Sequence, residues 1–447
     1  GQTNSLLSLS NHKCLIGPTT IRTPASPGST RIKLLSMQPS QPTDPVALHI
    51  MQGFPPEPKN LVRLQDGSGY IFPKTRWAFS HQRELVPTAT IRRGPAPAFS
   101  FSQSPRSDID TIGFTTLDGR PMSWAQGLIE TETDGILILH RGRIIYERYF
   151  GALTPERPHM AFSVTKSFVG LIAAMLQHQG ALDPNQLTTH YVPELASTAY
   201  ADATVRQVMD MTVGVRYSET YTDPTAEIWA YASACGVIPR APNYQGPQSI
   251  FAFLQTLQKE GAHDEAFAYK TCNTEVLGWI VQRLTGTTFA TLVSDWFWQQ
   301  LGTEEDAYVV VDGIGAAMCG GGLNTTLRDL ARFGEMMRRH GALNGRQLVP
   351  EAVVADITRG ADRDHFAKAG YQTLPGWSYR HQWWISHNNL GAYSARGIHG
   401  QAIWIAPSAE LVIVRYASHP TAANGNGPLD YISLPAYQAV ADHLLRA

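Results

Sequence analysis

The sequence predicts an α+β fold in which an antiparallel sheet is flanked by helices and a mostly helical region is inserted. Strand-rich hairpin patterns occur near the front of the chain, at residues 135–150, and near its end, at 401–416. A helical pattern closes the chain, and the stretch from about 183 to 300 has the pattern of helices joined by short loops. Strands this far apart in the sequence are expected to share one sheet.

The bulk composition indicates a globular protein without a strong charge. The 447 residues are 43% hydrophobic and 16% charged, with a formal net charge of −1, which is enough for a sizeable core. No basic field is present to hold nucleic acid. The longest apolar run, Phe168–Leu176, is too short to span a bilayer, so neither nucleic acid nor a membrane is expected as a partner.

Residues 1–70 are predicted to form a poorly ordered extension, and residues 71–447 the folded domain. The first 45 residues are rich in Ser, Thr and Pro, and residues 75–93 are expected to form an extended arm on the main body. His12 and Lys13 occupy the place of a secretory apolar core, so a cytoplasmic location is expected, although an export signal removed before Gly1 stays open. Free thiols are expected at the cysteines, which are Cys14, Cys235, Cys272 and Cys319.

The individual elements follow from local patterns. Two β-rich runs, 135–140 and 143–150, surround an Arg-Gly turn and predict a hairpin. A helix that begins near Ser163 and ends at Gly180 places apolar residues at helical spacing. The late runs 401–406 and 411–416 predict a second hairpin, and residues 434–445 a closing helix.

The first candidate for chemistry is the pair Ser163 and Lys166. Three residues apart on a helix, they share a face within side-chain reach, and a hydroxyl beside an amine can perform acyl transfer. The spacing alone is weak, because Ser10 and Lys13 repeat it, and a Ser at a helix start is most often a cap. Lys166, however, lies in a helix that is otherwise apolar nearly all round, where burial would lower its pKa and favour a base.

Two further stretches complete a candidate site. Tyr269 precedes a helix-like run and Gly397–Gln401 precedes the late hairpin; a core tyrosine and a simple turn are the alternatives. No Gly-x-Ser-x-Gly, His-Glu-x-x-His or Walker-type motif is present. Three scattered histidines (His140, His190 and His399) have no metal-ligand spacing, and Gly320–Gly322 is interpreted as a turn.

These motifs, in this order, resemble those of the penicillin-recognising serine hydrolases. From about Thr75 to the end, the chain is similar to the 6-aminohexanoate-dimer hydrolases, nylon-oligomer enzymes with esterase activity and a class C β-lactamase-like fold. The supporting stretches are 76–79, 191–195, 273–277, 382–384 and, as the most specific, Gly397–Gln401.

The resemblance implies a role for each site residue. Ser163 would be the nucleophile, Lys166 its base and Tyr269 the proton relay to the leaving group. The backbone N–H groups of Ser163 and Ile398 would form the oxyanion hole beside Gly397. Three further positions would contact substrate: Tyr221 at the leaving nitrogen of an amide, Trp384 as an apolar wall, and Gly397.

Two departures from the family pattern concern the substrate. Ala395-Arg396-Gly397 replaces the Lys-Thr-Gly element of β-lactamases, so the usual carboxylate clamp is missing, although Arg396 could replace it in part. The family also holds a substrate ammonium with an acidic side chain shortly after the Tyr221 position. Here Ile228–Ala232 contains no carboxylate beyond Glu227, which makes Ala232 the altered substrate-binding position.

The sequence therefore predicts a serine hydrolase that cleaves small carboxylic esters, linear amides of the aminohexanoate type, or both, through an acyl-enzyme. No metal or organic cofactor is expected, and a homodimer is compatible with the sequence. A β-lactamase or DD-peptidase, and a non-catalytic binding protein on the same scaffold, are the alternatives.

Overall fold

The computed structural model describes residues 41–423, 425 and 427–446. The expectations for residues 1–40, including those for Cys14 and for the Ser10 spacing, lie outside the described residues.

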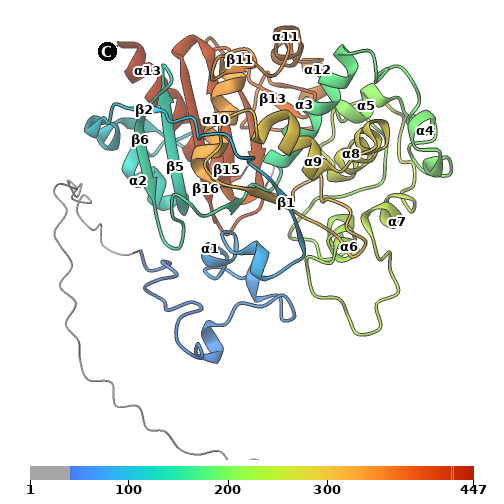
Figure 1. The fold of residues 1–447 in the computed structure, drawn as a ribbon, viewed down its shortest axis with the longest axis horizontal. Helices are drawn as coiled ribbons and strands as arrows, with labels where there is room; N and C mark the ends of the chain where they lie inside the picture. The colour runs from blue at the N-terminus through green and yellow to red at the C-terminus, as the bar shows by residue number, and fades with distance from the viewer. Residues whose placement is uncertain (1–40, 424, 426, 447) are drawn as a thin grey trace, which may run out of the picture. The chain divides into compact units, whose positions relative to one another are not determined.

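An eight-stranded sheet combines strands from the first half of the described chain with strands from its last part (Figure 1). β16 pairs antiparallel with β5, so the late hairpin continues the early one, as predicted from the sequence. All neighbours are antiparallel except β2 and β6, which are parallel at one edge. In sheet order, the strands are β12 (Ser378–Arg380), β13 (Trp383–Ile385), β14 (Tyr393–Gly397), β15 (Gln401–Ala406), β16 (Leu411–Ala417), β5 (Thr133–His140), β6 (Arg143–Tyr149) and β2 (Ser102–Gln103).

Helices cover both faces of this sheet, which explains the long apolar runs in its strands β5, β15 and β16. In β5, Leu137 and Leu139 face the large core that includes α3 (Val164–His178) and α10 (Leu327–Arg338). Ile136 and Ile138 face the opposite core, with α2 (Trp124–Glu130) and α13 (Pro428–Arg446). The closing helix α13 starts at Pro428, six residues earlier than predicted. Proline is favourable at the first helical position, which explains this start.

Between residues 183 and 300 the regular elements are all helices, joined by loops, as predicted. No helix within the described part of the chain combines the length and apolar character needed to cross a membrane. The helices are α4 (Thr188–Tyr191), α5 (Val205–Met209), α6 (Glu227–Cys235), α7 (Ile250–Leu254), α8 (Thr271–Thr285) and α9 (Phe289–Val293). The longest, α8, packs against α3, and this contact brings the inserted region to the main body.

Smaller elements complete the fold. A four-stranded sheet has the order β1 (Thr88–Ile91), β8 (Ala307–Val310), β9 (Leu323–Thr325) and β7 (His159–Met160). The predicted arm is thus extended only at β1, since its first part is α1 (Thr75–Ala78) and a 3₁₀ turn. The remaining elements are β3 (Gly113–Thr115), β4 (Pro121–Ser123), β10 (Ala342–Leu343), β11 (Arg346–Gln347), α11 (Glu351–Arg359) and α12 (Arg363–Ala367).

The compact unit begins at Gln41, so the boundary expected at residue 70 differs from the structure. Ile50 and Val62 are buried in one cluster with Phe79. The buried Arg76 guanidinium donates to Asp134 Oδ1 at 3.0 Å and to Gln41 Oε1 at 2.5 Å. A segment without periodicity can therefore be ordered by a few long-range contacts, which composition does not reveal.

Candidate active site

Ser163 lies at the head of α3 without acting as its cap. It has the N-cap position, but its side chain makes no capping hydrogen bond, and its Oγ lies 2.9 Å from Lys166 Nζ. The preceding Phe162 has a φ of 46°, an unusual backbone state for a bulky residue that accompanies functional sites. The capping interpretation of Ser163 is therefore wrong.

Lys166 is a buried amine within reach of the hydroxyl. Its side chain is about 1% exposed, and its Nζ donates to the carbonyl oxygen of Gly320 at 2.5 Å. Burial lowers the pKa of Lys166 to about 8, while the negative charges of Glu219 and Glu275 oppose that fall. Near neutral pH the neutral fraction of Lys166 is thus far larger than that of an ordinary lysine, which gives this residue the character of a base.

Tyr269 lies close to Lys166, just before α8. Lys166 Nζ stands 5.1 Å from the centroid of its ring. Burial raises the pKa of Tyr269 well above its ordinary value, and a hydrogen bond with Ser163 opposes that rise. The phenol is therefore protonated at neutral pH, so it can pass a proton on but does not stand as a phenolate base.

The end of β14 packs directly on the start of α3. A Cβ added at Gly397 would lie 2.7 Å from the Ala161 oxygen and 3.1 Å from the Ser163 nitrogen. Only glycine allows this approach. Among the described residues, the amides of Ser163 and Ile398 donate to no acceptor outside their own helix or strand, and two such N–H groups beside a hydroxyl can bind an oxyanion.

A cavity of about 400 Å³ contains Ser163 in its wall, together with Tyr221, Ala232 and Ile398. This volume is typical of small-molecule sites. No Asp, Glu, Lys or Arg lines it among the residues that the structure describes. The apolar and aromatic part of the wall consists of Tyr70, Met160, Phe162, Ile228, Trp229, Tyr231, Val237, Ile238, Met318, Pro420 and Ala422.

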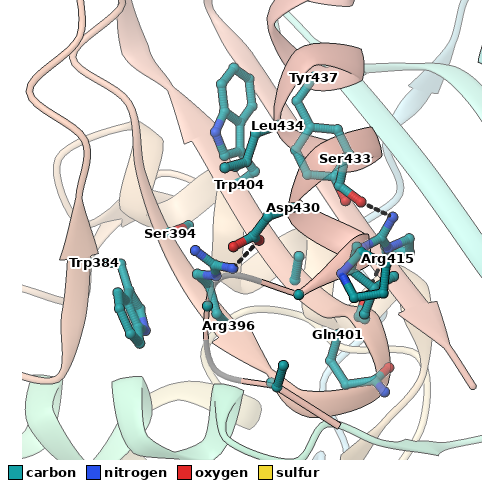
Figure 2. Close-up of a pocket in the computed structure, with 18 of the residues that line it drawn as sticks. Trp384, Ser394, Arg396, Gln401, Trp404, Arg415, Asp430, Ser433, Leu434 and Tyr437 are labelled. Carbon is teal, nitrogen blue, oxygen red and sulfur yellow. Dashed lines mark hydrogen bonds and ion pairs between the residues drawn. The ribbon is translucent and has the colours of Figure 1, made fainter. Parts of the chain in front are cut away.

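Trp384 does not line the cavity of Ser163, in contrast to the expected wall. It lines a neighbouring cavity with Tyr269 and Arg396, shown in Figure 2, and its ring packs on Tyr269 with the centroids 5.2 Å apart. Arg396 lies 5.2 Å over the Trp384 ring and forms an ion pair with Asp430. The arginine is therefore held beside the site and not in the cavity of the nucleophile.

Three participants were not identified from the sequence. The Gly320 turn supplies a carbonyl to Lys166, and Glu275 on α8 holds that turn through the Gly320 N–H at 2.7 Å. Glu219 accepts from the backbone N–H of Thr271 and from the Tyr221 hydroxyl. Only Glu275 carried a usable signal, as a carboxylate immediately before the apolar run Val276–Val281.

The scattered histidines do not gather into a metal site. Among the described residues, no group of three His, Cys, Asp or Glu side chains could hold a metal ion. His399 follows Ile398 in the cavity wall, and its Nδ1 lies 2.7 Å from the carbonyl oxygen of His419.

Comparisons with known proteins show the family of the chain. The chain is 36% identical over 350 residues to a 6-aminohexanoate-dimer hydrolase of Paenarthrobacter ureafaciens, which covers 78% of this chain and 86% of the relative. A Bacillus anthracis structure, provisionally assigned as a 6-aminohexanoate-dimer hydrolase, matches with a TM-score of 0.78 and 30% identity over 88% of this chain and 99% of its own.

A more distant structure shows the fold alone. A penicillin-binding protein homologue from Pyrococcus abyssi has a TM-score of 0.55 and 19% identity, over 72% of this chain and 75% of its own. The family model named Beta-lactamase matches residues 125–433, a range that includes Ser163, Lys166, Tyr269 and Ile398. Together with the 36% identical relative, this match identifies the chain as a hydrolase that belongs to the Beta-lactamase family.

Proposed function

We propose that this hydrolase cleaves small carboxylic esters, linear amides of the 6-aminohexanoate-oligomer type, or both, through an acyl-enzyme on Ser163. The observation that carries the proposal is the 2.9 Å contact between Ser163 Oγ and the buried Lys166 Nζ. A lysine whose pKa is lowered to about 8 can take the proton of a serine hydroxyl at that distance.

In the first half of the reaction, Ser163 Oγ attacks the substrate carbonyl while Lys166 Nζ accepts its proton. The developing negative charge on the carbonyl oxygen is stabilised by the N–H groups of Ser163 and Ile398. The proton then passes from Lys166 through Tyr269 to the leaving alkoxide or amine. The protonated phenol and its closeness to the Lys166 amine support this relay.

The second half repeats these transfers in the opposite direction. Water attacks the acyl carbonyl, Tyr269 and Lys166 remove its proton, and Ser163 leaves with that proton restored. The same two N–H groups stabilise the second tetrahedral intermediate. The products are the free acid and the regenerated enzyme.

The lining of the cavity favours uncharged acyl groups. Its wall has no charged side chain among the described residues, and Ala232 stands in it where the resemblance implies a carboxylate. Neutral esters therefore fit better than a substrate with a terminal ammonium, whose burial without a partner is costly. Tyr221 also lies in the wall, which supports linear amides as the second substrate class.

A β-lactamase or DD-peptidase is less well supported, because Ala395 replaces the lysine of the carboxylate clamp and Arg396 is paired with Asp430. A non-catalytic binding protein would have no need for the buried Lys166, whose desolvation is unfavourable.

A panel of substrates tests the proposal. Purified protein is assayed with a short-chain chromogenic ester, a linear amide and a β-lactam, each with Ser163→Ala as the control. We expect ester turnover that the variant loses; ester turnover that persists in Ser163→Ala would show that another nucleophile acts, and turnover of the β-lactam alone would favour the β-lactamase alternative.

A further inference from the structure

We infer that Glu275 is a positioning residue for Lys166. Its buried carboxylate holds the Gly320 turn, and the carbonyl of that turn accepts a hydrogen bond from Lys166. The carboxylate also stabilises the positive charge that Lys166 gains when it accepts the proton of Ser163. The inference rests on the proposed Ser163–Lys166 chemistry and adds a residue that does not itself contact the substrate.

Glu275 is a buried carboxylate with a full set of donors. Its side chain is about 2% exposed, Oε1 accepts the Gly320 N–H at 2.7 Å, and Oε2 accepts the Cys319 N–H at 3.1 Å. The Tyr231 hydroxyl donates to Oε1 as well. Burying a carboxylate is unfavourable unless it is paired, and an apolar side chain can stabilise a fold equally well. A requirement beyond packing therefore accounts for this residue.

Gly320 connects this carboxylate to the catalytic amine. The same residue donates its N–H to Glu275 and accepts a hydrogen bond from Lys166 Nζ at 2.5 Å. When Lys166 is neutral, this bond uses one of its N–H groups and leaves the lone pair free to face Ser163 Oγ.

The turn leaves no room for a side chain at Gly320. A Cβ there would lie 2.4 Å from Thr271 Cγ2 and 2.9 Å from Glu275 Oε1. The turn that carries this carbonyl therefore packs closely on α8, against Thr271 and Glu275.

The charges around Glu275 point to Lys166 as its electrostatic partner. The titratable groups that act on it or feel its charge are Lys166 from α3, Tyr231 and Cys235 from α6, and Cys319 from the turn. Burial raises the pKa of Tyr231 and of both thiols well above their ordinary values, so these three are neutral. Lys166 is thus the group among them that becomes charged during the reaction.

The ionisation of Glu275 fits this role. Burial raises the pKa of Glu275 to about 7, while its hydrogen bonds and Lys166 oppose the rise. The carboxylate is mostly ionised above that pH. The charge of Glu219 and, next to it in size, that of Glu275 raise the pKa of Lys166. The Glu275 carboxylate therefore stabilises the ammonium that forms when Ser163 Oγ loses its proton.

Glu275→Gln tests both parts of the inference. We measure the rate at which a fluorophosphonate labels Ser163, and ester kcat and KM, from pH 5 to 10. The plateau rate should fall about 10- to 100-fold because the lysine is misplaced, with KM unchanged. The acid limb, the part of the pH profile in which the rate rises with pH, should move to lower pH, because removal of a negative charge lowers the pKa of Lys166.

Two further variants separate the effect of the Glu275 charge from the effect of its side-chain length and from a general loss of stability. Glu335→Gln alters another buried carboxylate, about 1% exposed and paired with Arg338 on α10 at 2.7 Å, and should leave the rate and the pH profile unchanged. Glu275→Asp keeps the charge but shortens its reach, so it should lower the plateau and leave the acid limb in place. This variant also carries the test if Glu275→Gln does not fold.

The outcomes distinguish this inference from the proposed function. Wild-type protein that is labelled at Ser163, with Glu275→Gln matching it in rate and pH profile, would overturn the role of Glu275 and leave the nucleophile intact. If Glu275→Gln lowers the plateau rate but leaves the acid limb of the pH profile in place, the role of Glu275 is also overturned, since a structural defect alone has that effect. Wild-type protein that is not labelled at Ser163 would refute the proposed function itself.

Discussion

The burial of Lys166 gives the Ser163–Lys166 spacing its meaning. The same spacing occurs by chance at Ser10, and the sequence separates the two only through the apolar helix that follows Ser163. In the structure, α3 is buried from Val164 through Leu176, and this burial lowers the pKa of the lysine to about 8. The sequence pattern alone could thus identify Ser163 and Lys166 as a candidate pair. The residues that hold Lys166 in place, Gly320 and Glu275, could be identified only from the tertiary structure.

The pH dependence of acylation should report the ionisation of Lys166. Only the neutral amine can accept the serine proton, and lowering the pH below about 8 protonates it. We therefore expect ester kcat/KM to rise with pH up to about 8 and then to level off. A profile that is flat from pH 5 to 9, or turnover retained in Lys166→Met, would contradict the assignment of this base.

Ala232 is predicted to determine the preference between neutral and ammonium-bearing substrates. Ala232→Asp places a carboxylate in the wall of the Ser163 cavity, where it can pair with a terminal ammonium. Activity on 6-aminohexanoate dimer should rise relative to a short-chain ester, as measured by the ratio of kcat/KM values. An unchanged ratio would refute this explanation of the missing ammonium contact.

The elements that the sequence predicted best are those with strong local patterns. Both hairpins and the helix after Ser163 are confirmed at nearly the expected bounds. β12 and β13 escaped prediction because each has three residues, too few for an alternation to stand out. The approach of β14 to α3 could not be predicted either, since it joins segments more than 200 residues apart and depends on the missing side chain of Gly397.

The junction between β14 and α3 should be sensitive to a single methyl group. In Gly397→Ala the new Cβ would meet the Ala161 oxygen at 2.7 Å and the Ser163 nitrogen at 3.1 Å. Displacing an oxyanion donor typically lowers kcat about 100- to 1,000-fold, and we expect a loss of this size in ester assays. Gly113→Ala, where a Cβ meets nothing within 4 Å, is the matched control; equal kcat values for the two variants would contradict this role of β14.

At the scale of the whole molecule, the site depends on segments from most of the chain. The fold class and the serine hydrolase family could be predicted from the sequence, because the order of the motifs along the chain can be read without knowledge of the tertiary contacts. The participation of residues 41–70 could not be predicted, since neither composition nor periodicity reveals the buried Ile50 and Val62 or the place of Tyr70 in the cavity wall.

Removal of this segment should therefore affect both stability and activity. A chain that begins at residue 71 loses Tyr70 from the cavity and exposes the apolar cluster around Phe79 and Phe162. We expect a lower Tm and a lower kcat/KM than for a chain that begins at Gln41, measured by thermal denaturation and ester assay. Equal values for the two truncated chains would mean that residues 41–70 are dispensable.

The most direct test of the central claim is to locate the acyl-enzyme nucleophile. Wild-type protein is treated with a fluorophosphonate, digested and analysed by peptide mass spectrometry, with Ser163→Ala and Lys166→Met in parallel. We predict one adduct on the peptide that contains Ser163, absent from Ser163→Ala and formed far more slowly in Lys166→Met. An adduct found only on another residue, or labelling of Ser163→Ala at the wild-type rate, would contradict the assignment of Ser163 as the nucleophile.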